Sequence, residues 1–330
     1  MKIPYTQLKA EFLRVLLKNG FNADTAEQCA TIFAGNSRDG VYSHGLNRFP
    51  GFIEYVHEGL VKPNEKPTLF NVLGLIEQWD GNRAPGVINA TFCTDRAIVL
   101  AKQHGIGCVA IRNTNHWMRG GVYGQQAADA GCLAICFTNT IANVPPWGGI
   151  DPRLGNNPLV IAVPKQGGHV VLDMAMSQYS FGKLLQYRAN NNEALPLPGG
   201  YDEAGNLSTD ADAILKSKRV VPVGFWKGSG LTLMLDLLAT ILSRGNSTEK
   251  ITDTDRESGV SQVFICIHEP DAALVEHFTE QIIAYTKTSR PEKEGGSIAY
   301  PGEGMLKTRM RNLAEGIPVN ESIWNKLLSL

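Results

Sequence analysis

Residues 86–115 read GVINATFCTDRAIVLAKQHGIGCVAIRNTN and place a helix-like stretch directly before a strand-like one. Gly105, Gly107 and Ala110 match the spacing G-x-G-x-x-A, which in dinucleotide-binding folds joins a strand to a following helix. Here the order is reversed, because the helical period ends at Gly105 and the strand-like run follows it. We therefore interpret Gly105 as the end of a helix, and this stretch argues against a Rossmann fold.

Helix-like and strand-like stretches alternate through the middle of the chain, between helical ends. Helices are expected over 1–20, from Asp24 to about 39, over about 43–58, and later over 122–131, 231–245 and 274–288. Strand-like runs cover 71–81, 107–113, 132–140, 157–164, 169–175 and 263–269. Residues 186–222 are rich in Asn, Pro, Gly and Asp and predict a long surface excursion. The fold class is therefore mixed α/β.

Composition excludes several classes of protein. The 330 residues carry 31 Lys+Arg against 32 Asp+Glu, a formal net charge of -1. This balance provides no broad positive field, so we expect no nucleic-acid partner. A hydrophobic fraction of 43% supports sizeable cores and excludes disorder. The length predicts about two domains.

Membrane and targeting signals are not evident in the sequence. Residues 1–20 intersperse charged and apolar positions as an amphipathic helix does, unlike a signal peptide. The apolar stretch from Leu231 to Leu242, interrupted by Asp236, is too short to cross a bilayer and predicts a buried helix. The six cysteines include no C-x-x-C pair, which predicts reduced thiols in a cytoplasmic protein and no metal site.

Two histidines lie in settings that favour a role in binding or catalysis. In residues 41–50, VYSHGLNRFP, a helix would put His44 and Arg48 on one face. Arginine could hold a carboxylate while the imidazole exchanges a proton with the adjacent carbonyl oxygen; the alternative is a surface-capping histidine and a solvated arginine. His116 follows a strand-like run, where it could bind a carboxylate or orient a substrate oxygen, or be a hydrogen-bonded loop histidine.

Lys227 precedes Gly228, Ser229 and Gly230 at the expected start of a helix. Free backbone N–H groups at a helix start, together with a lysine, attract anions such as phosphate. The spacing does not match a Walker A sequence. A simple helix cap with a solvated lysine is therefore the alternative to a phosphate site.

Six ordered motifs together resemble the malate/L-lactate dehydrogenase family. They are GVYSHGLNRFP (40–50), NTNHWMRGG (113–121), PPWG (145–148), GNNP (155–158), DMA (173–175) and FWKGSG (225–230). The resemblance covers nearly the whole chain. It implies a fold distinct from the Rossmann dehydrogenases, with a largely non-parallel sheet, helical terminal regions and discontinuous domains.

The resemblance also implies an activity and a site. It implies NADH-dependent reduction, with NADPH as the alternative cofactor, of a 2-oxo or 2,3-dioxo sugar acid such as 2,3-diketo-L-gulonate, in a homodimer. By resemblance, His44 is the proton donor, and Ser43, Arg48 and His116 line the substrate site. The implied cofactor contacts are His169, Val170, Val171, Leu172, Asp173, Met174, Ala175, Trp226, Lys227, Gly302, Glu303 and Gly304.

The implied domains combine distant segments of the chain. They are a helical domain of 1–65 and 305–330, a cofactor-binding region of 66–120 with part of 155–304, and a substrate or dimerisation region within 121–225. Other activities remain open. The same machinery could oxidise ureidoglycolate, malate, lactate or sulfolactate, whereas a sugar-acid lyase, aldolase or binding protein would need no nicotinamide.

Overall fold

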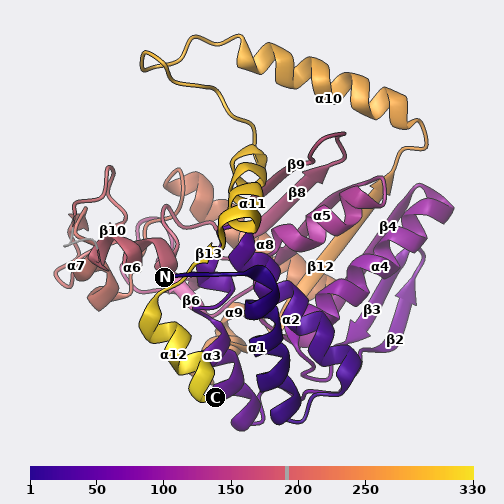
Figure 1. The fold of residues 1–330 in the computed structure, drawn as a ribbon, viewed down its shortest axis with the longest axis horizontal. Coiled ribbons are helices and arrows are strands. Elements are labelled where there is room, and N and C mark those ends of the chain that lie inside the picture. Colours follow the sequence, from indigo (N-terminus) through magenta and orange to yellow (C-terminus); the bar gives the residue numbers. More distant parts are fainter. Residues whose placement is uncertain (190–192) are drawn as a thin grey trace.

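The computed structural model describes residues 1–189 and 193–330, and a seven-stranded sheet lies at its centre (Figure 1). In spatial order its strands are β2 (Thr68–Leu73), β3 (Ile76–Asp80), β4 (Ile106–Asn115), β12 (Ser258–His268), β5 (Cys132–Thr138), β8 (Leu159–Val163) and β9 (Val170–Met174). β3 and β4 are parallel, and the other neighbouring strands are antiparallel. The prediction of a mixed fold with a largely non-parallel sheet is confirmed.

Helices cover both faces of this sheet. Successive side chains of a strand point to opposite faces, so Val109 and Ile111 pack with α4 (Gly86–His104) and α5 (Gly121–Asp129). Ala110 packs with α8 (Trp226–Ser243) on the other face. Gly105, with φ +86°, ends α4 as predicted.

The two chain ends share one helical layer. β1 (Lys2–Ile3) pairs with β13 (Ile317–Pro318), and both termini lie on the same side of the molecule in Figure 1. A single apolar core joins four helices, which are α1 (Tyr5–Lys18), α2 (Ala23–Arg38), α3 (Phe49–His57) and α12 (Glu321–Ser329). The core combines aliphatic side chains with the mutually contacting rings of Phe12, Phe33 and Phe49, so distant chain segments are held together by apolar burial.

The helix expected over 43–58 is interrupted. A short 3-10 turn, η1 (Tyr42–His44), is followed by a bend, and α3 begins at Phe49. Gly45 lies so close to α2 that a Cβ there would stand 2.1 Å from Ser37 Oγ. The chain must bend at this close approach, so His44 and Arg48 do not belong to one continuous helix.

Residues 186–222 are not a simple surface excursion. The segment around them contains α6 (Phe181–Ala189), β10 (Gly200–Tyr201), β11 (Leu207–Ser208) and α7 (Ala211–Ser217), which surround a small core including Leu184, Leu195, Ile214 and Val220. Its apolar residues are widely spaced among Pro and Gly, so periodicity conceals this core. Residues 190–192 lie outside the described part of the chain. The remaining short elements are β6 (Ala142–Val144), β7 (Leu154–Gly155) and α9 (Thr248–Thr252).

The prediction that residues 231–242 form a buried helix is wrong for the isolated chain. α8 buries one face on the sheet, but Met234 and Ile241 on its other face are 51% and 66% exposed. α10 (Ala272–Lys287) stands away from the sheet and is joined by a long loop to α11 (Glu303–Glu315) (Figure 1). Within the described residues, no helix is long and apolar enough to span a membrane.

Candidate active site

His44 lies at the end of η1, between the terminal helical layer and the sheet. Its Nδ1 atom is 3.0 Å from Ser43 Oγ. Asn36 of α2 donates a side-chain hydrogen bond of 2.9 Å to the His44 carbonyl oxygen. Both contacts fix the backbone and the ring of a residue that sits in an irregular turn.

His116 follows the last residue of β4 and stacks on His44. The two imidazole centroids are 5.6 Å apart and the rings are inclined by 21°. The Met118 N–H donates to His116 Nδ1 at 2.9 Å, and Met118 has the left-handed φ of +62°. Because Nδ1 accepts this bond, a neutral His116 carries its proton on Nε2 and presents a donor.

Arg48 completes the group of four residues predicted for the substrate site. Arg48 and His116 line a small cavity of about 50 Å³ together with residues of α3. Arg48 Nη2 is 3.5 Å from the carboxylate of Glu257, in the loop before β12. Since β12 runs antiparallel to β4, its beginning lies beside the end of β4 that leads to His116.

The electrostatics of the site favour neutral imidazoles. Burial, the neighbouring His116 and the Arg48 charge lower the pKa of His44 to about 3, while Glu257 acts in the opposite direction. Burial and Arg48 also lower the pKa of His116 to about 3. Burial raises the pKa of the Glu257 carboxyl, with Arg48 opposing the shift. Without a bound anion, the site therefore resists positive charge on either histidine.

The three segments predicted to contact a cofactor converge along β9. Val171 N–H donates to the carbonyl oxygen of Pro301 at 3.0 Å, which places the loop containing Gly302 against this strand. At the other end of β9, Val223 N–H donates to the Met176 carbonyl oxygen at 2.8 Å. Three residues later α8 begins at Trp226. The sequence alone did not indicate that these distant segments meet.

The groups along β9 suit a dinucleotide chemically. Trp226 is 64% exposed, so its indole offers a flat apolar surface at the start of α8. The positive end of this 18-residue helix, with Lys227 beside it, favours phosphate. Glu303 instead forms an ion pair with Lys287 at 3.0 Å and connects α11 to the end of α10.

A charge cluster, buried at Asp39 and Arg119, connects β9 with the loop that follows His116. Asp173 Oδ2 accepts a hydrogen bond of 2.8 Å from Gly121 N–H, at the start of α5. Arg119 lies 3.8 Å from Asp173 and 3.1 Å from Asp39, which also binds Arg309 of α11. The cluster fixes the relative positions of α2, α5, β9 and α11, and therefore of both halves of the site.

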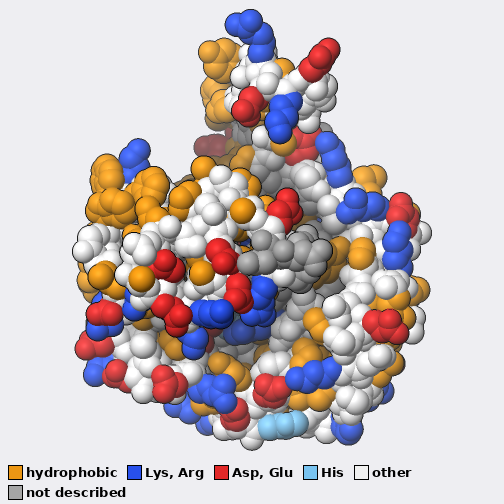
Figure 2. All heavy atoms as spheres, turned by 90° about the vertical axis from the view of Figure 1, so that its left-hand side faces the viewer, with side chains coloured by type: hydrophobic (Ala, Val, Ile, Leu, Met, Phe, Trp, Pro, Cys, Tyr) orange, Lys and Arg blue, Asp and Glu red, His pale blue; other side chains and the backbone are white. Residues whose placement is uncertain are grey.

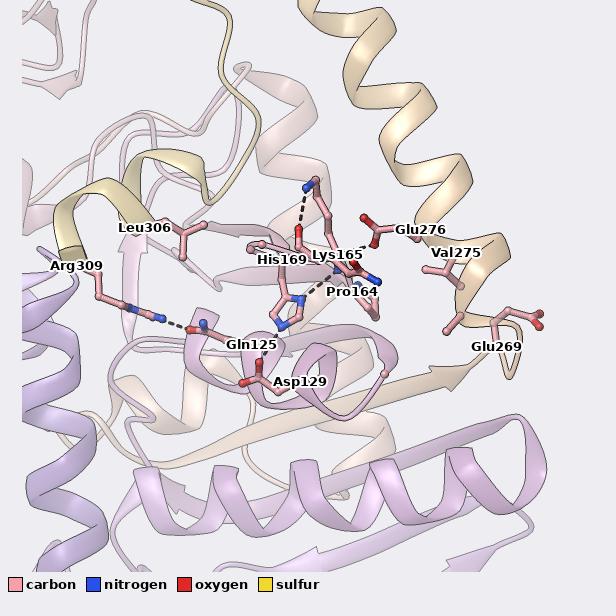
Figure 3. Close-up of a pocket in the computed structure, with 15 residues that line it drawn as sticks. Gln125, Asp129, Pro164, Lys165, His169, Glu269, Val275, Glu276, Leu306 and Arg309 are labelled. Atoms are coloured by element: carbon pink, nitrogen blue, oxygen red, sulfur yellow. Dashed lines mark hydrogen bonds and ion pairs between the residues drawn. The ribbon is translucent and has the colours of Figure 1, made fainter.

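The larger cavity adjoins the His169 end of β9 (Figure 3). It has a volume of about 540 Å³ and lies between α5, the β8–β9 loop, α10 and α11. His169 Nε2 contacts Asp129 at 2.7 Å, and its Nδ1 accepts from Lys165 N–H at 3.1 Å. His169 is therefore engaged with the cavity wall, and Gln125, one turn before Asp129 in α5, is joined to Arg309 of α11 (Figure 3).

Comparison with known proteins identifies the family and the fold. A model of the malate/L-lactate dehydrogenase family matches residues 3–328. The 2,3-diketo-L-gulonate reductase of Citrobacter koseri is 45% identical over 334 aligned positions covering 100% of both chains. The chain belongs to the malate/L-lactate dehydrogenase family. Malate dehydrogenase of Entamoeba histolytica superposes with a TM-score of 0.94 at 23% identity, covering 100% of this chain and 96% of the other.

Family membership defines the general activity. The chain is an oxidoreductase similar to 2,3-diketo-L-gulonate reductases, and the family consists of NAD(P)-dependent dehydrogenases. Malate dehydrogenase of Pyrococcus horikoshii is 29% identical and superposes with a TM-score of 0.89. The match covers 100% of this chain and 94% of the Pyrococcus chain. The fold that positions His44 and His116 is thus the fold of this dehydrogenase family.

Sequence reasoning missed Glu257 and the Asp39 cluster. Glu257 lies in the polar stretch TDTDRES, which is typical of a solvated loop. Asp39 follows a helix, where a charged residue needs no special explanation. Neither position carries a local signal, because each gains its partners only through contacts between distant segments.

Proposed function

We propose that this member of the malate/L-lactate dehydrogenase family reduces a 2-oxo or 2,3-dioxo sugar acid, such as 2,3-diketo-L-gulonate, with NADH. The observation that carries the proposal is the stacking of His44 on His116 beside Arg48. The Arg48 guanidinium and the two imidazoles match the carboxylate and the adjacent carbonyl oxygen of such a substrate. The 45% identity to a 2,3-diketo-L-gulonate reductase supports this substrate class.

Arg48 and His116 hold the substrate in this proposal. The Arg48 guanidinium binds the substrate carboxylate through two parallel hydrogen bonds. The neutral His116 donates from Nε2 to a substrate oxygen, because its Nδ1 is occupied by the Met118 N–H. Together they fix the orientation of the carbonyl group that is reduced.

His44 supplies the proton to the forming alkoxide. Nδ1 lies 3.0 Å from Ser43 Oγ, so in the protonated ring Nδ1–H donates to this oxygen and Nε2 is the atom that delivers the proton. After transfer the neutral ring retains Nδ1–H, so the Ser43 contact is maintained throughout. A positioned acid of this kind contributes about 10²–10⁴ to the rate.

NADH would be held along β9, by residues 169–175, 226–227 and 302–304. When bound, the cofactor supplies the hydride that reduces the carbonyl carbon. The protein's part is to orient the bound molecules, with the α8 start and Lys227 suited to the pyrophosphate and Trp226 to an aromatic ring. NADPH is the alternative, and it differs only by a phosphate on the adenosine ribose.

We also propose that the protein acts as a homodimer joined through α8 and α10. Leu274, Phe278, Ile282 and Tyr285 follow helical spacing and leave an apolar face of α10 between 42% and 81% exposed. In Figure 2 the segment above the body carries hydrophobic as well as charged side chains. A second copy of the chain is the occupant that would cover both apolar faces at once.

The dimer is tested by the mass of the protein in solution. We expect light scattering after gel filtration to give twice the 35.9 kDa of one chain. Ile241→Glu should reduce that mass, because it buries a charge in the interface, while Lys250→Gln, at an exposed position of α9, should not. A monomeric wild-type protein would contradict the proposal.

The activity is tested by a spectrophotometric screen of the purified protein. NADH and NADPH are each offered with 2,3-diketo-L-gulonate, pyruvate, oxaloacetate and sulfopyruvate, and oxidation of the corresponding hydroxy acids and ureidoglycolate is followed with NAD⁺. We expect the highest kcat/KM with NADH and the sugar acid. Turnover of a sugar acid without any nicotinamide would instead favour a lyase or an aldolase.

A further inference from the structure

Glu257 is a carboxylate that the activity described above does not use. Its side chain is only 14% exposed, and its Oε2 atom is 3.5 Å from Arg48 Nη2. Withdrawing a carboxylate from water is costly unless a partner compensates it. The Ile141 N–H also donates a hydrogen bond to this carboxylate, which adds a second favourable contact.

The loop that carries Glu257 is anchored on both sides. Ser258 Oγ donates to Asn115 Oδ1 at 2.9 Å, immediately before His116. On the other side, Arg256 contacts the carboxylate of Glu58 at 2.7 Å. Its guanidinium also lies 5.7 Å from the ring of Tyr55, in the helix that follows Arg48. Glu257 is therefore fixed relative to both segments that carry the substrate-site residues.

Neighbouring charges of both signs act on the pKa of His44. Arg48, Arg119 and His116 disfavour a positive charge on this ring, and Glu257 favours it. Arg119 in turn lies 3.1 Å from Asp39, a carboxylate that it shares with Arg38 and Arg309. Arg48 is compensated by Glu257, so a substrate carboxylate entering the site adds negative charge to a pair that is already balanced.

We propose that Glu257 is a positioning residue that holds the Arg48 guanidinium ready for the substrate carboxylate and provides the fixed negative charge that favours protonated His44. The inference rests on the proposed function, since it assigns a purpose to Glu257 only if His44 donates a proton. Glu257 acts through Arg48 and His44 and does not exchange a proton with the substrate.

Three variants separate the charge of Glu257 from its packing. Glu257→Gln keeps the shape and removes the charge, whereas Glu257→Asp keeps the charge on a shorter side chain. Glu315→Gln is the matched control, because it removes a carboxylate from the exposed ion pair with Lys2, which has no part in anchoring Glu257. For each variant, kcat and KM for NADH-dependent reduction are measured from pH 5 to 9, together with thermal unfolding and NADH affinity.

For Glu257→Gln we expect the pH at which kcat for reduction declines to move down by about one unit, with kcat about tenfold lower above it. NADH affinity should not change. Glu257→Asp should retain the wild-type pH profile with a higher KM, and Glu315→Gln should match the wild type in all respects.

A Glu257→Gln variant with wild-type kcat and pH profile would overturn the inference. A Glu257→Gln variant with a lower kcat, a lower melting temperature and an unshifted pH profile of kcat would also overturn it, because that combination indicates a structural role alone. If the wild type itself consumes no NADH with any 2-oxo acid, the proposed function fails instead. The two failures are therefore distinguishable.

Discussion

The pH dependence of reduction follows from the environment of His44. Burial together with His116 and Arg48 lowers the pKa of His44 to about 3 in the free enzyme. Between pH 5 and pH 8 the free enzyme therefore holds a neutral His44, and reduction must take its proton from solution. Because kcat/KM reports the protonation of the free enzyme, its value for reduction should fall tenfold for every unit of rising pH.

The size of this effect makes it easy to measure. Over three pH units we expect a decline of about 1,000-fold, equivalent to ~4 kcal/mol in the activation barrier. Oxidation of the hydroxy acid needs neutral His44, so its kcat/KM should be flat over the same range. The two directions of one reaction thus serve as controls for each other.

The assay is the initial rate of NADH absorbance change at low substrate concentration, with NADH affinity measured at each pH. A plateau of kcat/KM for reduction below about pH 6.5, followed by a decline, would show that His44 titrates at its ordinary value. That result would refute the inference that burial and Arg48 keep the ring neutral.

Three further perturbations test the packing and charges of the site. Asp39→Asn should lower the free energy of unfolding by about 3–5 kcal/mol in urea denaturation, because it removes the buried carboxylate that pairs with both Arg119 and Arg309; a loss below 1 kcal/mol would contradict this, and Asp151→Asn at the exposed Asp151–Arg153 pair is the control. Gly45→Ala should cost about 1–3 kcal/mol and lower kcat, because its Cβ would lie 2.1 Å from Ser37 Oγ; wild-type stability and kcat would count against this contact. Because the pKa of His116 is lowered to about 3 in the folded protein, the unfolded chain takes up this proton first, and stability is lost as the pH falls below about 6.5. His116→Asn should therefore reduce the slope of unfolding free energy against pH, between pH 5.5 and 4.5, by ~1.4 kcal/mol per pH unit. An unchanged slope would show that His116 titrates as an ordinary histidine.

Local sequence patterns predicted the sheet and most of its helices because those elements bury periodic apolar faces. The reversed order around Gly105 was informative for the same reason, since a helix end and a strand start are both local events. Local patterns failed where packing decided the outcome. The bend at Gly45 arises from its contact with Ser37, eight residues earlier in the chain.

The apolar stretch of α8 illustrates a different limit. Its composition predicts burial, yet Ile241 is 66% exposed in the single chain. A run of apolar residues indicates that a helix face is buried, but it does not indicate which surface covers that face.

The site was predictable in part. His44, Arg48 and His116 were selected from their local settings, and the family resemblance added Ser43. Glu257 could not be found in this way, because its partner Arg48 lies more than 200 residues away in the chain. A buried ion pair between distant segments leaves no periodic signal in either of them.

The most direct test of the account compares the wild type with His44→Ala in the oxidation of NADH by 2,3-diketo-L-gulonate, with NADH affinity measured on both proteins. We expect the wild type to turn over, the variant to lose at least about 10²-fold in kcat, and the two proteins to bind NADH with equal affinity. Near-normal NADH oxidation by the His44→Ala protein would contradict the claim that His44 donates the proton.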